Sequence, residues 1–311
     1  MPTSPRSAFR PCRGAFRPWW RAAAAALVAV LLTAVPSVAS ATAPVSSRPP
    51  LTDAEWAAHT RLVDERVAEA VSRGRETDVL YTVGHDRAHW LPSRARLHDQ
   101  VARELYARGT AVPAHGKAVL TGGLPGAGKT TVLRDNPFVN PKDYLVLSSD
   151  DAKEVMCAHD MIPPVAGIAP MEAADLVQRE SAHITELVAD RARRERRNVI
   201  WDTTMSSVPA IDKRVAPLRA AGYTEISALF LDLPVEVSVR RVDQRHRSGY
   251  ERYRDGERCE GRHVPADLVR RQADPVWGSR NRAAFEATKP AYDHWYRYDS
   301  THLPPTLADQ G

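Results

Sequence analysis

The chain has 311 residues, of which 43% are hydrophobic and 26% are charged. This length accommodates one large domain or two small ones, and the composition excludes a collagen-like, disulfide-dense or wholly disordered chain. The 43 Lys and Arg residues outnumber the 38 Asp and Glu residues by five. Five arginines and no acidic residue lie in residues 1–43, so the rest of the chain carries 38 basic and 38 acidic residues. This neutral balance does not favour a general attraction to nucleic acid.

Residues 1–43 have the pattern of a secretory signal peptide. A basic segment ends at Arg21, an apolar run extends from Ala22 to about Val35, and small residues follow Pro36 in the spacing that signal peptidase cleaves. The apolar run is shorter than the ~20 residues of a membrane span. We therefore expect a secreted or extracytoplasmic mature chain without a stable membrane span. The alternatives are an uncleaved anchor, or a start codon placed too far upstream, which predicts a cytoplasmic protein.

The chain contains three cysteines. Cys12 is removed with the signal, which leaves Cys157 and Cys259. An even pair in an exported chain is compatible with a disulfide and equally with two free thiols, because the sequence does not give their separation.

Two helices are expected before residue 117. After a linker at 44–50, Thr52 and Glu55 have the spacing of a capping box, and the helix that they begin ends at Gly74. A second helix is expected over 93–107, because Leu97, Val101 and Leu105 recur at four-residue intervals.

From Lys117 onward, short apolar runs alternate with helical patterns. This alternation predicts an α/β fold with a parallel sheet flanked by helices and preceded by the N-terminal helical region. Ligands in such sheets bind beyond the carboxyl ends of the strands. The expected strands are 118–121, 144–148, 198–201, 226–231 and 295–298, and the expected helices are 129–134, 171–196, 208–221 and 235–247. The tail after Leu303 is expected to be loose.

The segment after the first strand has the spacing G-x-x-x-x-G-K-T, which is typical of a phosphate-binding loop. Glycines allow backbone N–H groups to surround a phosphate, and the following helix adds its positive end. Lys129 is expected at the β- and γ-phosphates, and the Thr130 hydroxyl at Mg²⁺. The expected nucleotide-binding residues are Gly123, Leu124, Pro125, Gly126, Ala127, Gly128, Lys129, Thr130 and Thr131.

Carboxylates follow the next two strands. Asp150 and Asp151 follow the second strand, and we expect Asp150 to take the proton of an acceptor hydroxyl while Asp151 lies in the first turn of a helix. Asp202 closes the third strand and is expected to bind Mg²⁺ or the acceptor, with Thr204 close by.

Basic side chains after the fourth strand suit the stabilisation of a migrating phosphoryl group. Arg245 lies on an arginine-rich helix, and Arg262 precedes a short helix in a segment that can close over the site. From the residues alone, Glu186 is only one of several acids on a helix. His85 and His89 favour surface or capping roles over a metal site.

Together, the loop G-G-L-P-G-A-G-K-T-T, the acid after L-S-S-D-D, the strand end W-D-T-T, the arginine helix and G-R-H-V-P resemble the zeta toxin family over about 117–270. The resemblance implies an ATP- and Mg²⁺-dependent kinase that phosphorylates a UDP-sugar such as UDP-N-acetylglucosamine. It also implies an antitoxin or immunity partner. It places Glu186, Asp202 and Thr204 in the acceptor pocket, and Arg245 and Arg262 at the phosphates.

Together with the patterns above, the resemblance predicts a signal at 1–43, a linker and helical region at 44–116, a kinase domain with an α/β fold of the P-loop kinase type at 117–303 and a tail at 304–311. Two other functions stay open at this point. A polynucleotide 5′-hydroxyl kinase shares the carboxylates after the strands, but it requires a basic groove. A non-catalytic nucleotide-binding module would have no acceptor pocket.

Overall fold

The computed structural model describes residues 48–311. The expected signal peptide at 1–43 lies outside this part of the chain. Within it, none of the helices combines the length and apolar character that crossing a membrane requires.

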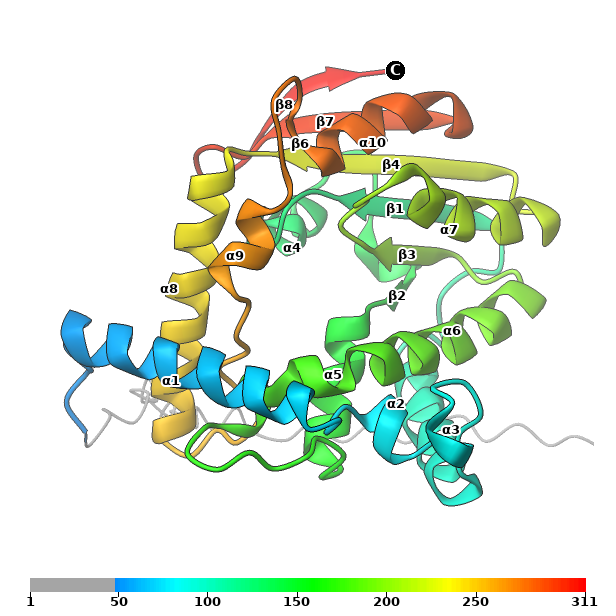
Figure 1. Ribbon diagram of the computed structural model, residues 1–311. Helices are drawn as coiled ribbons and strands as arrows, with labels where there is room; N and C mark the ends of the chain where they lie inside the picture. Colours follow the sequence, from blue (N-terminus) through cyan, green and yellow to red (C-terminus); the bar gives the residue numbers. More distant parts are fainter. Residues whose placement is uncertain (1–47) are drawn as a thin grey trace, which may run out of the picture. The chain divides into compact units, whose positions relative to one another are not determined.

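A six-stranded sheet in the order β2-β3-β1-β4-β7-β8 forms the centre of the fold (Figure 1). The first five of these strands are parallel, and β8 runs antiparallel to β7. The strands are β1 Lys117–Gly122, β2 Leu145–Leu147, β3 Val199–Asp202, β4 Glu225–Asp232, β7 His294–Asp299 and β8 Thr306–Gln310, and a separate antiparallel pair is formed by β5 Ala273–Asp274 and β6 Gly278–Ser279.

Helices surround the sheet. The α-helices are α1 Asp53–Ser72, α2 Thr77–Leu80, α3 Pro92–Ala107, α4 Lys129–Arg134, α5 Ser149–Ala158, α6 Gln178–Arg194, α7 Val208–Ala220, α8 Val235–Arg254, α9 Ala266–Arg270 and α10 Arg280–Thr288. Short 3-10 helices are η1 Val83–His85, η2 Pro141–Asp143, η3 Pro170–Val177 and η4 Lys289–Ala291.

Both faces of the central strands β1, β3 and β4 are buried, which explains why these strands have almost continuous apolar sequences. In β1, Ala118 and Leu120 belong to one core cluster, which also contains side chains from α3, α5, α6 and α7. Val119 belongs to a second cluster on the opposite face, with Leu124 and with Val132 from α4. The five parallel strands predicted from the sequence are confirmed, as is the P-loop kinase-like sheet.

The expected helix over 171–196 is in fact two elements. Residues 170–177 form the 3-10 helix η3, and the regular helix α6 begins at Gln178. Nearly every side chain of η3 is buried, including that of Glu172, so this segment lacks the exposed face of an ordinary surface helix.

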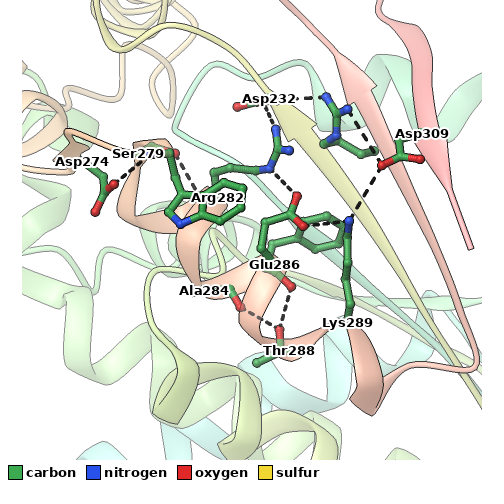
Figure 2. A network of polar contacts seen from close by, with 12 residues as sticks. Asp232, Asp274, Ser279, Arg282, Ala284, Glu286, Thr288, Lys289 and Asp309 are labelled. Carbon is green, nitrogen blue, oxygen red and sulfur yellow. Dashed lines mark hydrogen bonds and ion pairs between the residues drawn. The ribbon is translucent and has the colours of Figure 1, made fainter.

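The prediction of a loose C-terminal tail is wrong. Residues 306–310 form β8, and the backbone of Gly311 exchanges two hydrogen bonds with Trp295. Asp309 is held by Lys289 at 3.8 Å and by Arg297 at 3.9 Å, in a network that extends through Glu286 and Arg282 to Asp232 at the end of β4 (Figure 2). All five side chains of β8 are exposed, so the strand has no apolar pattern by which it could be predicted.

The N-terminal helical region packs against η3 and α6. The predicted capping box is confirmed, since Thr52 accepts a hydrogen bond from the N–H of Glu55 and the Glu55 carboxylate accepts one from the N–H of Thr52. A buried ion pair joins Arg94 of α3 to Glu180 of α6, with Nε–Oε1 at 2.5 Å and Nη2–Oε2 at 2.9 Å. These contacts hold α1 and α3 against η3 and α6, two elements that contribute residues to the cleft described below.

Candidate functional site

The carboxyl ends of β1, β2 and β3 lie side by side, as the parallel order requires. Thr121 of β1 is paired in register with Asp202 of β3, so the last residue of β3 lies next to the start of the glycine-rich loop. The Gly123 N–H donates a hydrogen bond to the Thr204 carbonyl oxygen at 3.2 Å, which ties the loop to the segment after β3.

The glycine-rich loop has a backbone that only glycine adopts without strain. Gly123, Gly126 and Gly128 all have positive φ angles, of 126°, 74° and 84°. A Cβ atom on Gly123 would lie 2.4 Å from the Leu231 carbonyl oxygen. The Ser238 hydroxyl donates to the Pro125 carbonyl oxygen at 2.6 Å, which holds the loop on α8. The loop is therefore a fixed concave cradle that ends at the amino terminus of α4, a geometry suited to phosphate.

Lys129 is the first residue of α4 and faces the end of β3. Its Nζ lies 3.3 Å from Oδ1 of Asp202, and the same oxygen accepts a hydrogen bond from the Thr121 hydroxyl at 3.0 Å. The Lys129 and Asp202 side chains keep 18% and 28% of their surface accessible. An ammonium group and a carboxylate are thus held at the open side of the cradle, where a phosphate tail and a divalent cation would replace their mutual contact.

Asp150 lies in the first turn of α5, directly after β2. The Ser148 hydroxyl caps this helix by accepting hydrogen bonds from the N–H groups of Asp150 and Asp151. The Asp150 carboxylate forms an ion pair with Arg262, and Nζ of Lys153 lies 3.8 Å away. Burial raises the pKa of Asp151, opposed by the charge of Arg108. Both carboxylates line the cleft, and Asp150 is the one that is paired with Arg262.

Two arginines line the same cleft: Arg262 is partly buried, whereas Arg245 is exposed to solvent on α8. Desolvation in the cleft lowers the pKa of Arg245, opposed by the charge of Asp202, and burial lowers the pKa of Arg262 to about 10. Both guanidinium groups stay charged at neutral pH. The Arg262 segment lies directly on α8 with no side chain between them, since a Cβ atom on Gly249 would lie 2.5 Å from the Gly261 nitrogen.

Glu186 is placed one layer behind the site. It forms ion pairs with Arg214 of α7 and, at 3.7 Å, with Arg193. The Arg214 guanidinium stacks over the Trp201 ring at 4.1 Å from the centroid. The Trp201 indole N–H is buried and has no hydrogen-bond partner among the described residues. Arg214 lines the cleft and Glu186 does not, so Glu186, which was expected in the acceptor pocket, lies behind Arg214.

One cleft of about 1070 Å³ connects these groups. Of the residues expected from the sequence, its lining includes Pro125, Gly126, Ala127, Gly128, Lys129, Thr130, Asp150, Asp202, Thr204, Arg245 and Arg262. Gly123, Leu124, Thr131 and Glu186 are not among the lining residues. The phosphate cradle and the candidate base therefore share a single cavity.

A disulfide crosses one side of this cleft. Cys157, near the end of α5, is bonded to Cys259, with the Cα atoms 5.8 Å apart and a sequence separation of 102 residues. It ties the helix that carries Asp150 to the segment that carries Arg262. Of the two alternatives that the sequence left open, a disulfide and two free thiols, the structure contains the disulfide.

Several side chains that line the cleft were not expected from the sequence, among them Lys153, Trp201 and Arg214. Lys153 follows Asp150 by three residues on a helix, a spacing that places both on one face and that was available as a signal. Trp201 directly precedes Asp202, but its place in an apolar strand predicts a core residue and not a site residue. Arg214 carries no local signal, because its role depends on the packing of α7 beside β3.

Comparison with known proteins adds a family and a fold. A family model described as "Zeta toxin" matches residues 103–279. A solved complex of AvrRxo1-ORF1 with AvrRxo1-ORF2, crystallised with ATP, is similar over 86% of this chain and 74% of that chain, with 14% identity and a TM-score of 0.53. A structure from the PezAT chromosomal toxin–antitoxin system of Streptococcus pneumoniae is similar over 71% and 81% of the two chains, with 15% identity and a TM-score of 0.50. No curated protein matches the sequence significantly.

Proposed function

Because this chain belongs to the zeta toxin family, we propose that it is a kinase that transfers the γ-phosphate of ATP to a hydroxyl of a UDP-sugar such as UDP-N-acetylglucosamine. Family membership and the P-loop kinase-like fold support a nucleotide-binding, kinase-like function. The observation that carries the proposal is that Lys129 and Asp150 line the same cleft.

The cradle fits a nucleoside triphosphate tail. Its three glycines with positive φ leave no Cβ atoms to obstruct backbone N–H groups, and Lys129 adds a charge at the open side. Thr130 and Asp202 are the residues that would hold Mg²⁺, which neutralises charge on the phosphates when bound. In this proposal Asp202 exchanges its contact with Lys129 for the cation.

The transfer step uses Asp150 as the base. As the acceptor oxygen bonds to the γ-phosphorus, the bond from that phosphorus to the bridging oxygen breaks and ADP leaves. The Asp150 carboxylate takes the proton of the acceptor hydroxyl. Arg262, now paired with Asp150, and Arg245 would contact the phosphoryl oxygens as charge moves onto them.

The acceptor side of the cleft suits an anionic, hydroxyl-bearing molecule. Lys213 and Arg214 line the wall opposite α8, so cations remain for an acceptor diphosphate after the cradle has bound ATP. Trp201 adds an aromatic surface and a buried indole N–H that lacks a partner among the described residues. A buried donor without a partner favours a polar ligand group at that position.

The test is a phosphotransfer assay on the purified chain with labelled ATP and UDP-N-acetylglucosamine. We expect Asp150→Asn to lower kcat by about 10²–10⁴-fold while ATP still binds, since a general base contributes that much. Asp151→Asn is the matched control, because it removes a neighbouring carboxylate of the same cleft. Full turnover by Asp150→Asn would refute the assignment of the base, and transfer only to a 5′-hydroxyl oligonucleotide would refute the acceptor.

We also propose that the mature chain works outside the cytoplasm and has an inhibitory partner. The Cys157–Cys259 bond supports an oxidising compartment. The similar solved proteins come from toxin–antitoxin and ORF1:ORF2 complexes, which supports a protein partner. Amino-terminal sequencing of the exported product tests the first proposal, since a chain that still begins at Met1 contradicts cleavage.

A further inference from the structure

A second group of polar side chains lies where α1, η3 and α8 meet. Oε1 of Glu172 lies 2.6 Å from Nε2 of His59 and 2.7 Å from Nε2 of His246. The side chains of Glu172 and His246 are 0% and 1% exposed, and that of His59 is 10% exposed. The three ligand-type atoms all lie within 4.8 Å of one another. We call these three residues the His59 cluster.

A chain of contacts leads away from the cluster. Nδ1 of His246 lies 3.2 Å from Nδ1 of His263, and Nε2 of His263 lies 2.8 Å from Oδ1 of Asp64. His263 is also largely buried, whereas Asp64 reaches the surface of α1. The contacts therefore run from the Asp64 carboxylate through the imidazoles of His263 and His246 to Glu172, which His59 also contacts.

These contacts cannot all be hydrogen bonds among neutral imidazoles. Four contacts each need one proton: two to Glu172, one between the histidines and one to Asp64. Three neutral imidazoles supply only three N–H groups, and carboxylates supply none. Protonating one ring supplies the fourth proton and balances the charge of buried Glu172, while the Asp64 side chain is 49% exposed and stays solvated.

A divalent cation satisfies the same contacts without a charged imidazole. With Nε2 of His59, Nε2 of His246 and a Glu172 oxygen bound to the metal, the Nδ1–H of His246 donates to Nδ1 of His263, whose Nε2–H donates to Asp64. Every contact is then satisfied by neutral imidazoles, and two carboxylates balance the 2+ charge. A ligating histidine whose second nitrogen is oriented through hydrogen bonds to a carboxylate is the usual arrangement around zinc.

From this geometry we propose that His59, Glu172 and His246 form a zinc site separate from the nucleotide cleft. Two imidazoles and a carboxylate are a donor set that Zn²⁺ binds, with a water as the fourth ligand. Tetrahedral ligand bonds of about 2.0–2.2 Å place ligand atoms about 3.3 Å apart, so the two nitrogens, now 2.6 and 2.7 Å from Oε1 of Glu172, must move outward by about 0.7 Å. His59 lies at the entrance, stacked on Tyr250, with its ring 4.0 Å from the tyrosine ring centroid.

The site would join the N-terminal helix to the kinase core. His59 belongs to α1 and His246 to α8, while His263 directly follows Arg262. The metal would therefore stabilise the packing of α1 and, through His246 and His263, the segment that carries Arg262.

The experiment is a Co²⁺ and Zn²⁺ titration of the full chain after dialysis against EDTA, in excess Mg²⁺. We expect one equivalent of Co²⁺ to give visible absorption bands of a tetrahedral site, lost when Zn²⁺ is added. Zn²⁺ at about 100 times its Kd should raise the melting temperature by roughly 5–10 °C. Asp64→Asn should weaken binding about 10–100-fold, as is usual for residues that orient a ligand.

His59→Ala should bind Zn²⁺ at least about tenfold more weakly. His89→Ala is the matched control, because His89 is an exposed histidine paired with Asp86, and its loss should change nothing. Circular dichroism checks that His59→Ala is folded. Absent Co²⁺ bands with an unchanged melting temperature, or wild-type Zn²⁺ affinity in folded His59→Ala, would overturn the proposal.

Discussion

Removing the Cys157–Cys259 bond should destabilise the fold substantially. The bond closes a loop with a sequence separation of 102 residues. In the chain-entropy treatment, a loop of about 100 residues restricts the unfolded chain by about 4.7 kcal/mol at 25 °C. Measured effects are commonly 2–5 kcal/mol, so we expect reduction to lower the free energy of unfolding by an amount in this range. Cys157→Ala/Cys259→Ala should lose a similar amount, plus a contribution from the emptied space at buried Cys157.

Urea unfolding with and without dithiothreitol measures this difference. Dithiothreitol should lower the urea midpoint of the wild type and leave that of the double alanine variant unchanged. Thiol titration of the unfolded chain checks the state of the bond, because with three cysteines the oxidised full chain exposes one thiol and the reduced chain three. A wild type that contains the bond but unfolds at the same urea concentration after reduction would contradict the reasoning.

Three further predictions concern the loop, a buried phenol and a helix cap. Gly123→Ala should weaken ATP binding at least about tenfold in calorimetry, since its Cβ atom would lie 2.4 Å from the Leu231 carbonyl oxygen, and wild-type affinity would contradict this cradle geometry. Burial raises the pKa of Tyr223 to about 12, so its contribution to stability is complete below pH 10 and is lost between pH 10 and 12. Between pH 10 and 12, the urea midpoint of Tyr223→Phe should therefore fall less steeply with pH than that of the wild type. Equal slopes for the two proteins would contradict a raised pKa of Tyr223. Thr52→Ala should cost about 1 kcal/mol through loss of the capping box, measured by urea unfolding against Thr110→Ala, an exposed threonine outside the helices.

The elements that could be predicted from the sequence are those with a local signal. The loop around Lys129 was predictable because glycines at fixed spacing between an apolar strand and a helix have few other uses. The central strands β1, β3 and β4 were predictable because both of their faces are buried, which makes their sequences apolar.

The missed features depend on packing between distant segments. β8 pairs through its backbone and has five exposed side chains, so no periodic pattern marks it. Glu186 was expected in the acceptor pocket, but the neighbouring Arg214 lies between it and the cleft. The His59 cluster brings together residues 59, 172 and 246, which no spacing rule connects.

The contact between Gly249 and Gly261 has a consequence for genetics. Because two backbones touch there, even one added methyl group on α8 must push the neighbouring segment outward and carry Arg262 away from Asp150. In a selection for chains that have lost their activity, substitutions of Gly249 should recur among the survivors, although this position is not among the residues that line the cleft.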